Sequence, residues 1–115
     1  MEDRTIMTFK EFQALTAEHL KLQQEVLTRK GKFYNPNAAR LESFHNTGQA
    51  KQETPERALW GMFYKHITGI QSAIYGLDRG VIPDYYRTTE SLLDMTTYPI
   101  LLKGLFLEHP EFNRI

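Results

Sequence analysis

Apolar residues recur at three- and four-residue spacing along most of the chain, which is the period of an amphipathic helix. The first apolar stripe comprises Phe12, Leu15, His19, Leu22 and Val26. Before it, Thr8 followed by Glu11 fits a capping box, and after it Gly31 supplies a stop signal. These patterns predict a first helix over residues 9–30.

A short second helix is expected after the break at Pro36. Asn37 can cap this helix, whose buried residues would be Ala38, Leu41 and Phe44. The following segment, HNTGQAKQ at residues 45–52, is polar and predicts a loop.

The third expected helix is long and has a well-defined start. Thr54 can act as its N-cap, and Pro55 suits its first position because the missing N–H would have no helical partner there. Its inner face would consist of Leu59, Phe63, His66, Ile67, Ile70, Ile74 and Leu77, where the helix should end.

A fourth helix is expected to begin between Asp84 and Thr89, to contain Pro99 and to continue to about Glu108. No segment alternates between apolar and polar residues for long enough to predict a strand. We therefore expect one all-α domain over residues 1–115, a bundle of three long helices and one short helix.

Composition narrows the range of partners. The 14 basic and 14 acidic residues cancel, so no broad positive field would attract nucleic acid, and the one dense basic cluster is Arg29, Lys30 and Lys32. The absence of cysteine excludes disulfides and thiolate metal sites. With neither a signal-peptide pattern nor a long apolar run, we expect a cytoplasmic protein without a membrane partner.

Two acids in the fourth helix need an explanation. Glu90 and Asp94 lie one turn apart on a ridge that continues through Tyr98 and Leu101 toward the core. Two carboxylates on an inward face repel each other and lose solvation, which a divalent cation or basic partners would relieve. The alternatives are that Glu90 is a favourable first-turn acid and that Asp94 is simply solvated.

The first helix offers possible partners for these acids, because Glu11, Glu18 and Glu25 recur every seven residues along one border of its stripe. Oxygen ligands without cysteine suit Mg²⁺ or Mn²⁺ better than zinc. The simpler interpretation of the three glutamates is a solvated flank. Similarly, His19 and His66 are expected to be hydrogen-bonded histidines of the apolar stripes rather than metal ligands.

Four segments, taken in order, resemble a pattern found in small all-α proteins of bacteriophages and bacteria. The segments are EVLTRKGKFYN, RLESFHN, FYKHITGI and ESLLDMTTYPILL. This pattern is similar to that of the MazG-like proteins and of the related nucleotide modification associated domain, and it covers roughly residues 18–106. The resemblance implies a helical pyrophosphohydrolase fold in which Mg²⁺ bridges a nucleoside triphosphate and an attacking water.

The resemblance also implies roles for individual residues. Glu90 and Asp94 would be metal ligands, and Glu18 or Glu25 would supply a carboxylate from the first helix. The expected substrate contacts are Lys30, Tyr34, Lys65 and Tyr98. The spacing departs from the family pattern, which has E-x-x-E on one helix and E-x-x-D on another, whereas Glu18 and Glu25 are seven residues apart and Glu90 and Asp94 are four apart.

We therefore expect a magnesium-dependent nucleotide-binding protein that hydrolyses a nucleoside triphosphate to monophosphate and pyrophosphate or only binds it. The alternative is a small helical interaction or inhibitor protein without catalysis. Its candidate contact residues are the aromatic side chains Trp60, Phe63, Tyr64, Tyr85 and Tyr86. Because the short second helix would leave apolar surface barely covered, we also expect a homodimer.

Overall fold

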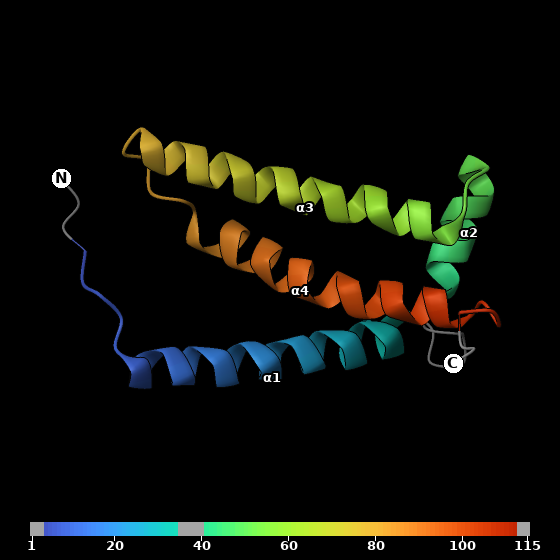
Figure 1. Cartoon of the computed structure of the whole chain (residues 1–115), viewed down its shortest axis with the longest axis horizontal. Coiled ribbons are helices and arrows are strands. Elements are labelled where there is room, and N and C mark those ends of the chain that lie inside the picture. Colours follow the sequence, from blue (N-terminus) through green and yellow to red (C-terminus); the bar gives the residue numbers. More distant parts are fainter. Residues whose placement is uncertain (1–3, 35–40, 113–115) are drawn as a thin grey trace.

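The computed structural model describes residues 4–34 and 41–112, without the side chains of residues 29–34. These residues form four helices, α1 (Phe9–Tyr34), α2 (Glu42–Lys51), α3 (Pro55–Asp78) and α4 (Tyr85–Leu107), and no strand occurs among them (Figure 1). The all-α fold predicted from the sequence is confirmed. Within this described part, none of the four helices has the length and apolar character that a bilayer-spanning segment needs.

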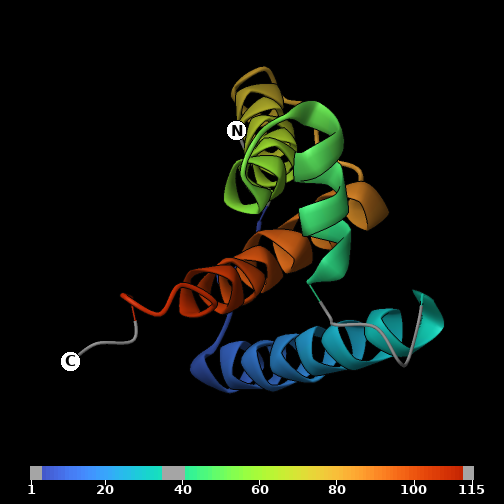
Figure 2. The same cartoon turned by 90° about the vertical axis from the view of Figure 1, so that its right-hand side faces the viewer.

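α4 is the central helix of the molecule. α3 packs along one side of α4 and α1 packs on another, while the short α2 packs on α3 at the end where α3 begins (Figure 1). Seen from the side, α4 lies between α3 and α1 (Figure 2). The two contacts of α4 are unequal, because α1 and α4 diverge toward the N-terminus of α1 (Figure 1).

Side-chain caps fix the starts of three helices. The backbone N–H of Glu11 donates to Thr8 Oγ1 at 3.1 Å, and that of Thr8 donates to Glu11 Oε1 at 2.9 Å, which confirms the capping box. At the start of α3, the side chain of Thr54 accepts a hydrogen bond from the backbone N–H of Arg57. At the start of α4, the side chain of Asp84 accepts one from the backbone N–H of Arg87. Pro99 lies inside α4, as expected.

The prediction of a loop at residues 45–52 is wrong, because α2 runs through most of that segment. Gly48 lies within this helix and is buried. A Cβ at this position would lie 2.7 Å from the carbonyl oxygen of Glu53, so glycine is needed where α2 meets the entry to α3. Asn37 and Ala38, predicted to begin this helix, lie outside the described residues.

The end of α1 also differs from the prediction. The helix continues to Tyr34, although Gly31 had indicated an end near residue 30. Glycine lowers helix propensity by only about 1 kcal/mol, which neighbouring helical residues can offset.

The buried core lies at the α2 end of the molecule. It is formed by Phe44 of α2, Leu59 of α3 and Leu101 and Leu105 of α4. Around it pack the partly buried side chains of Leu27, Leu41, Phe63, Tyr98 and Leu102. The N-terminal half of α3 and the C-terminal half of α4 therefore bury the apolar stripes that their sequences predict.

The opposite end of the molecule is uncovered. Ile74 and Leu77, predicted for the inner face of α3, are 54% and 39% exposed, so that part of the prediction is wrong. Here the last turns of α3, the first turns of α4 and the first turns of α1 come to the same end of the fold (Figure 1). We call the exposed apolar side chains of these segments and of the connection between α3 and α4 the open end: Phe9, Phe12, Leu15, Ile74, Leu77, Val81, Ile82 and Leu92.

Candidate functional site

A histidine of α3 and a carboxylate of α4 meet between the two helices. His66 Nε2 lies 3.3 Å from Asp94 Oδ2, and His66 Nδ1 lies 3.3 Å from Ser91 Oγ. The imidazole thus bridges two residues that are three apart on α4, hence on one face of that helix. Asp94 is only 8% exposed, so an inward-facing acid is present at the predicted position, and its partner in the fold is His66.

Aromatic rings continue this polar group toward the core. The ring of Tyr98, one turn after Asp94, meets His66 edge-on at 5.4 Å between centroids and Phe63 at 6.0 Å. Phe63 in turn contacts Trp60 at 5.7 Å. Burial, together with the negative charge of Asp94, raises the pKa of Tyr98 above its usual value of 10.0. The Tyr98 hydroxyl is therefore a neutral hydrogen-bonding group at neutral pH.

Glu90 is placed differently from Asp94. Its side chain is exposed, although it lies one turn before Asp94 on the ridge that was expected to turn inward. The first turns of α4 lie at the same end of the fold as the open end, where none of the described helices covers this ridge. Glu90 therefore presents its carboxylate to solvent beside the buried Asp94.

The three glutamates of α1 have different surroundings. Glu11 is the capping-box residue, and hydrogen bonds from the backbone and the side chain of Thr8 lower its pKa. Glu18 is exposed and Glu25 is half-buried. No group of three His, Asp or Glu side chains within the described ranges is arranged to hold a metal ion.

The expected substrate contacts are only partly described. Lys65 is exposed on α3, adjacent in sequence to His66, and Tyr98 is half-buried. The side chains of Lys30 and Tyr34 lie outside the described residues, although both residues belong to α1. The structure therefore gives the side-chain positions of two of the four predicted substrate-binding residues. Lys65 lies on the surface, and Tyr98 packs against His66.

α1 is joined to α4 by polar contacts that the sequence did not reveal. His19 Nε2 lies 2.8 Å from Thr96 Oγ1, and Gln23 Nε2 donates to the carbonyl oxygen of Thr96 at 2.8 Å. The hydrogen-bonded interpretation of His19 and His66 is thus confirmed. Thr96 lies on the opposite side of α4 from His66, and no sequence pattern identified it as the partner of His19 and Gln23.

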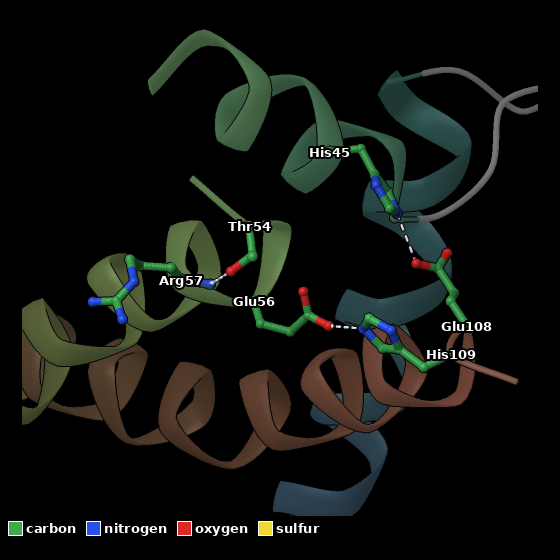
Figure 3. Close-up of polar contacts among 6 residues, drawn as sticks. All are labelled: His45, Thr54, Glu56, Arg57, Glu108 and His109. Atoms are coloured by element: carbon green, nitrogen blue, oxygen red, sulfur yellow. Dashed lines mark hydrogen bonds and ion pairs between the residues drawn. The ribbon is translucent and has the colours of Figure 1, made fainter. Parts of the chain in front are cut away.

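Two further histidine–carboxylate pairs close the α2 end (Figure 3). His45 of α2 lies 2.7 Å from Glu108, and His109 lies 2.5 Å from Glu56 in the first turn of α3. Burial acts to raise the pKa of Glu56. The hydrogen bond with His109, with help from the local backbone and from the charges of His109 and His45, outweighs this effect and lowers that pKa. These pairs tie α2 and α3 to the end of α4, and their sequence separation left no pattern that could predict them.

Comparisons with protein-family models, with curated proteins and with solved structures found no match.

Proposed function

We propose that the chain is a magnesium-dependent nucleotide-binding protein whose site lies around Asp94 on α4. The observation that carries this proposal is the pair formed by the buried Asp94 and the partly buried His66 at the contact between α3 and α4. Replacing such a pair by apolar side chains is often neutral or stabilising. Because an apolar pair could stabilise the fold equally well, we attribute the Asp94–His66 pair to ligand binding. The resemblance to MazG-like proteins suggests that this ligand is a nucleotide.

The arrangement of carboxylates suits a metal that arrives with its nucleotide. Mg²⁺ is commonly held by one or two carboxylates, with waters and substrate phosphates as the other ligands. Glu90 and Asp94, on successive turns of α4, would provide the two carboxylates, and Mn²⁺ could replace Mg²⁺. The metal would offset phosphate charge and polarise the scissile bond. No larger ligand set from the protein is needed for this mode of binding.

Neighbouring side chains suit the rest of a nucleotide. The exposed ammonium of Lys65 can approach phosphate oxygens, and the rings of Tyr98 and Trp60 offer stacking surfaces for a base. If the bound triphosphate is hydrolysed, the carboxylate that deprotonates the water would be Glu18 or Glu25 of α1. The products would be the monophosphate and pyrophosphate.

Trp60 provides a direct test, because it is the single tryptophan of the chain and contacts Phe63 in the same row of rings. We would titrate the protein with nucleoside triphosphates, with and without Mg²⁺, and follow tryptophan fluorescence. A saturable change that requires Mg²⁺ is expected, and pyrophosphate release would be measured in parallel.

Two variants sharpen this titration. Asp94→Asn should lose the Mg²⁺-dependent change, whereas Asp78→Asn, the same substitution at an exposed position of α3, should retain it. Absence of any metal-dependent fluorescence change or calorimetric heat in the unmodified chain would refute nucleotide binding. Binding without pyrophosphate release would leave a protein that binds nucleotide and does not hydrolyse it.

A second candidate is a helical interaction protein without catalysis, and the open end favours it. Large exposed apolar surfaces mark interaction sites. Tyr85 and Tyr86, at the start of α4, are also exposed and stack edge-on against each other at 5.3 Å. Recovery of one stoichiometric partner whose binding Tyr86→Ala weakens, with no nucleotide bound, would support this function over the first.

A further inference from the structure

We infer that the residues following α4 form a pH-sensitive clasp, which holds α2 against α3 while His45 and His109 are protonated. The clasp comprises residues 108–112. This inference goes beyond nucleotide binding and rests on separate observations. They are the contacts of the clasp, the short length of α2 and the chemistry of histidine–carboxylate pairs.

The clasp joins two helices through two consecutive residues. Glu108 lies 2.7 Å from the ring of His45 on α2, and His109 lies 2.5 Å from Glu56 in the first turn of α3 (Figure 3). The clasp supplies the acid in one pair and the histidine in the other. Separation of the clasp from either helix therefore breaks a contact between a histidine and a carboxylate.

Backbone and ring contacts hold the clasp in a folded shape. The backbone N–H of His109 donates to the carbonyl oxygen of Phe106 at 3.0 Å, and that of Phe112 donates to the carbonyl oxygen of His109 at 3.0 Å. The ring of Phe112 also meets that of Phe106 at 5.6 Å between centroids. The clasp is thus fixed on the end of α4, from which Glu108 and His109 reach the other two helices.

α2 depends on tertiary contacts of this kind. It has 10 residues, and isolated helices shorter than about 12–15 residues are marginal in water. Its N-cap residue, Leu41, makes no side-chain hydrogen bond, and its buried residues are Phe44 and Gly48. Weakening one tertiary contact should therefore shift the equilibrium between docked and locally unfolded α2.

Protonation of the histidines controls the strength of both pairs. A hydrogen bond between an imidazolium and a carboxylate is about twice as strong as one between neutral groups, and histidine ordinarily changes charge between about pH 5 and pH 8. Burial acts to raise the pKa of Glu56, but the hydrogen bond with His109, the local backbone and the charges of His109 and His45 lower it. The part of this effect that comes from charge exists only while the two histidines carry protons.

The other charged side chains on the segments that meet here balance one another. Among the described side chains there are four acids and four bases on the second half of α1, on α2, around the start of α3 and at the end of α4. They are Glu25, Glu42, Glu53, Glu111, Lys21, Lys51, Arg57 and Lys103. The two histidine–carboxylate pairs are therefore the groups from which we expect the pH response.

The direction of the response follows from which groups are charged. Between about pH 5 and pH 6 the histidines are protonated and the acids are ionised, so both pairs are ion pairs. As the pH rises toward about 8 the histidines become neutral, and α2 should be held less tightly. At the acidic limit, the lowered pKa of Glu56 means that its contribution is lost only as the pH falls through that lowered value.

Hydrogen exchange of the backbone amides, followed by mass spectrometry, tests the inference on the unmodified chain. We would compare the protection of α2 with that of the middle of α3 at about pH 5.5 and pH 8, after correction for intrinsic exchange rates. The ratio should fall by about threefold to tenfold at the higher pH, as expected for two partly exposed pairs. An unchanged or rising ratio would overturn the inference. Because nucleotide binding is read from Trp60 fluorescence, that outcome would leave the proposed function standing.

Histidine variants assign the response to the clasp. His45→Gln combined with His109→Gln keeps N–H donors for the carboxylates but removes the titrating groups, so the ratio should no longer depend on pH. His19→Gln is the matched control, because His19 contacts the hydroxyl of Thr96 rather than a carboxylate. This control should retain the pH dependence of the parent chain. Persistence of that dependence in the double variant, or its loss in the control, would contradict the clasp.

Discussion

At the scale of single residues, His66 is the side chain that makes the burial of Asp94 tolerable. It reaches Asp94 with one ring nitrogen and Ser91 with the other, and both contacts join α3 to α4. The same imidazole packs edge-on against Tyr98. One histidine thus connects the acid, the hydroxyl group and the aromatic row of the proposed site.

Removing His66 should expose the cost of the buried carboxylate. His66→Phe keeps a ring against Tyr98 but leaves Asp94 without its partner, and we expect a loss of about 1–3 kcal/mol in the free energy of unfolding. Adding Asp94→Leu should restore most of that loss, because an apolar pair can replace a buried polar pair. Urea denaturation at one fixed protein concentration measures both effects. A double variant as unstable as His66→Phe would show that the carboxylate is not the source of the loss.

Tyr98 should make the protein sensitive to alkali. Its pKa is raised in the fold by burial and by the charge of Asp94, so the folded state favours the neutral phenol. The stability that this contributes is present below the unfolded tyrosine pKa of about 10 and is lost as the pH rises through the folded value. Tyr98→Phe removes the titrating group, so the variant should lose less stability than the parent between about pH 8 and pH 10.5. Parallel losses in urea midpoint would contradict this assignment.

At the scale of elements, the starts of the helices can be predicted from neighbouring residues in the sequence. The packing of the helices depends on residues such as Gly48, whose role cannot be predicted in that way. Thr8 with Glu11 and Thr54 with Pro55 cap α1 and α3 as predicted. Gly48, in contrast, is part of a helix because the chain entering α3 passes directly against it. Close backbone approach, rather than a turn, explains this glycine.

Two glycine substitutions distinguish these roles. Gly48→Ala should destabilise the protein by about 1–3 kcal/mol, because the new Cβ would overlap the carbonyl oxygen of Glu53. Gly69→Ala, within α3, meets no atom within 4 Å and should stabilise the protein by about 0.5–1 kcal/mol through helix propensity. Thermal unfolding followed by circular dichroism measures both changes. Equal effects in the same direction would mean that α2 does not approach α3 as described.

At the scale of the whole molecule, the fold is closed at one end and open at the other. α2 and the histidine–carboxylate pairs of His45 with Glu108 and of His109 with Glu56 complete the closed end (Figure 3). The open end has exposed apolar side chains on three helices, and no further helix among residues 4–34 and 41–112 covers them.

The homodimer expected from the sequence predicts a thermal midpoint that depends on protein concentration. A dimer that dissociates on unfolding is stabilised by mass action, so the midpoint should rise across a hundredfold range of concentration. Phe9→Glu places a charge on an exposed apolar position in the first turn of α1 and should reduce this dependence. Ala14→Glu adds the same charge on the opposite face of α1 and should retain it. A midpoint that is independent of concentration in the parent chain would indicate a monomer.

By itself the sequence determined the all-α class, the caps of α1 and α3 and the inward position of Asp94, because these features depend on neighbours within one or two helical turns. Tertiary structure alone decided that His66 is the partner of Asp94, that Glu90 is exposed, and that Ile74 and Leu77 have no cover. The physical reason is that helical periodicity identifies an apolar face without identifying what packs on it. Which part of each face is buried depends on where α1 and α4 diverge, a property of the assembled helices and not of any one of them.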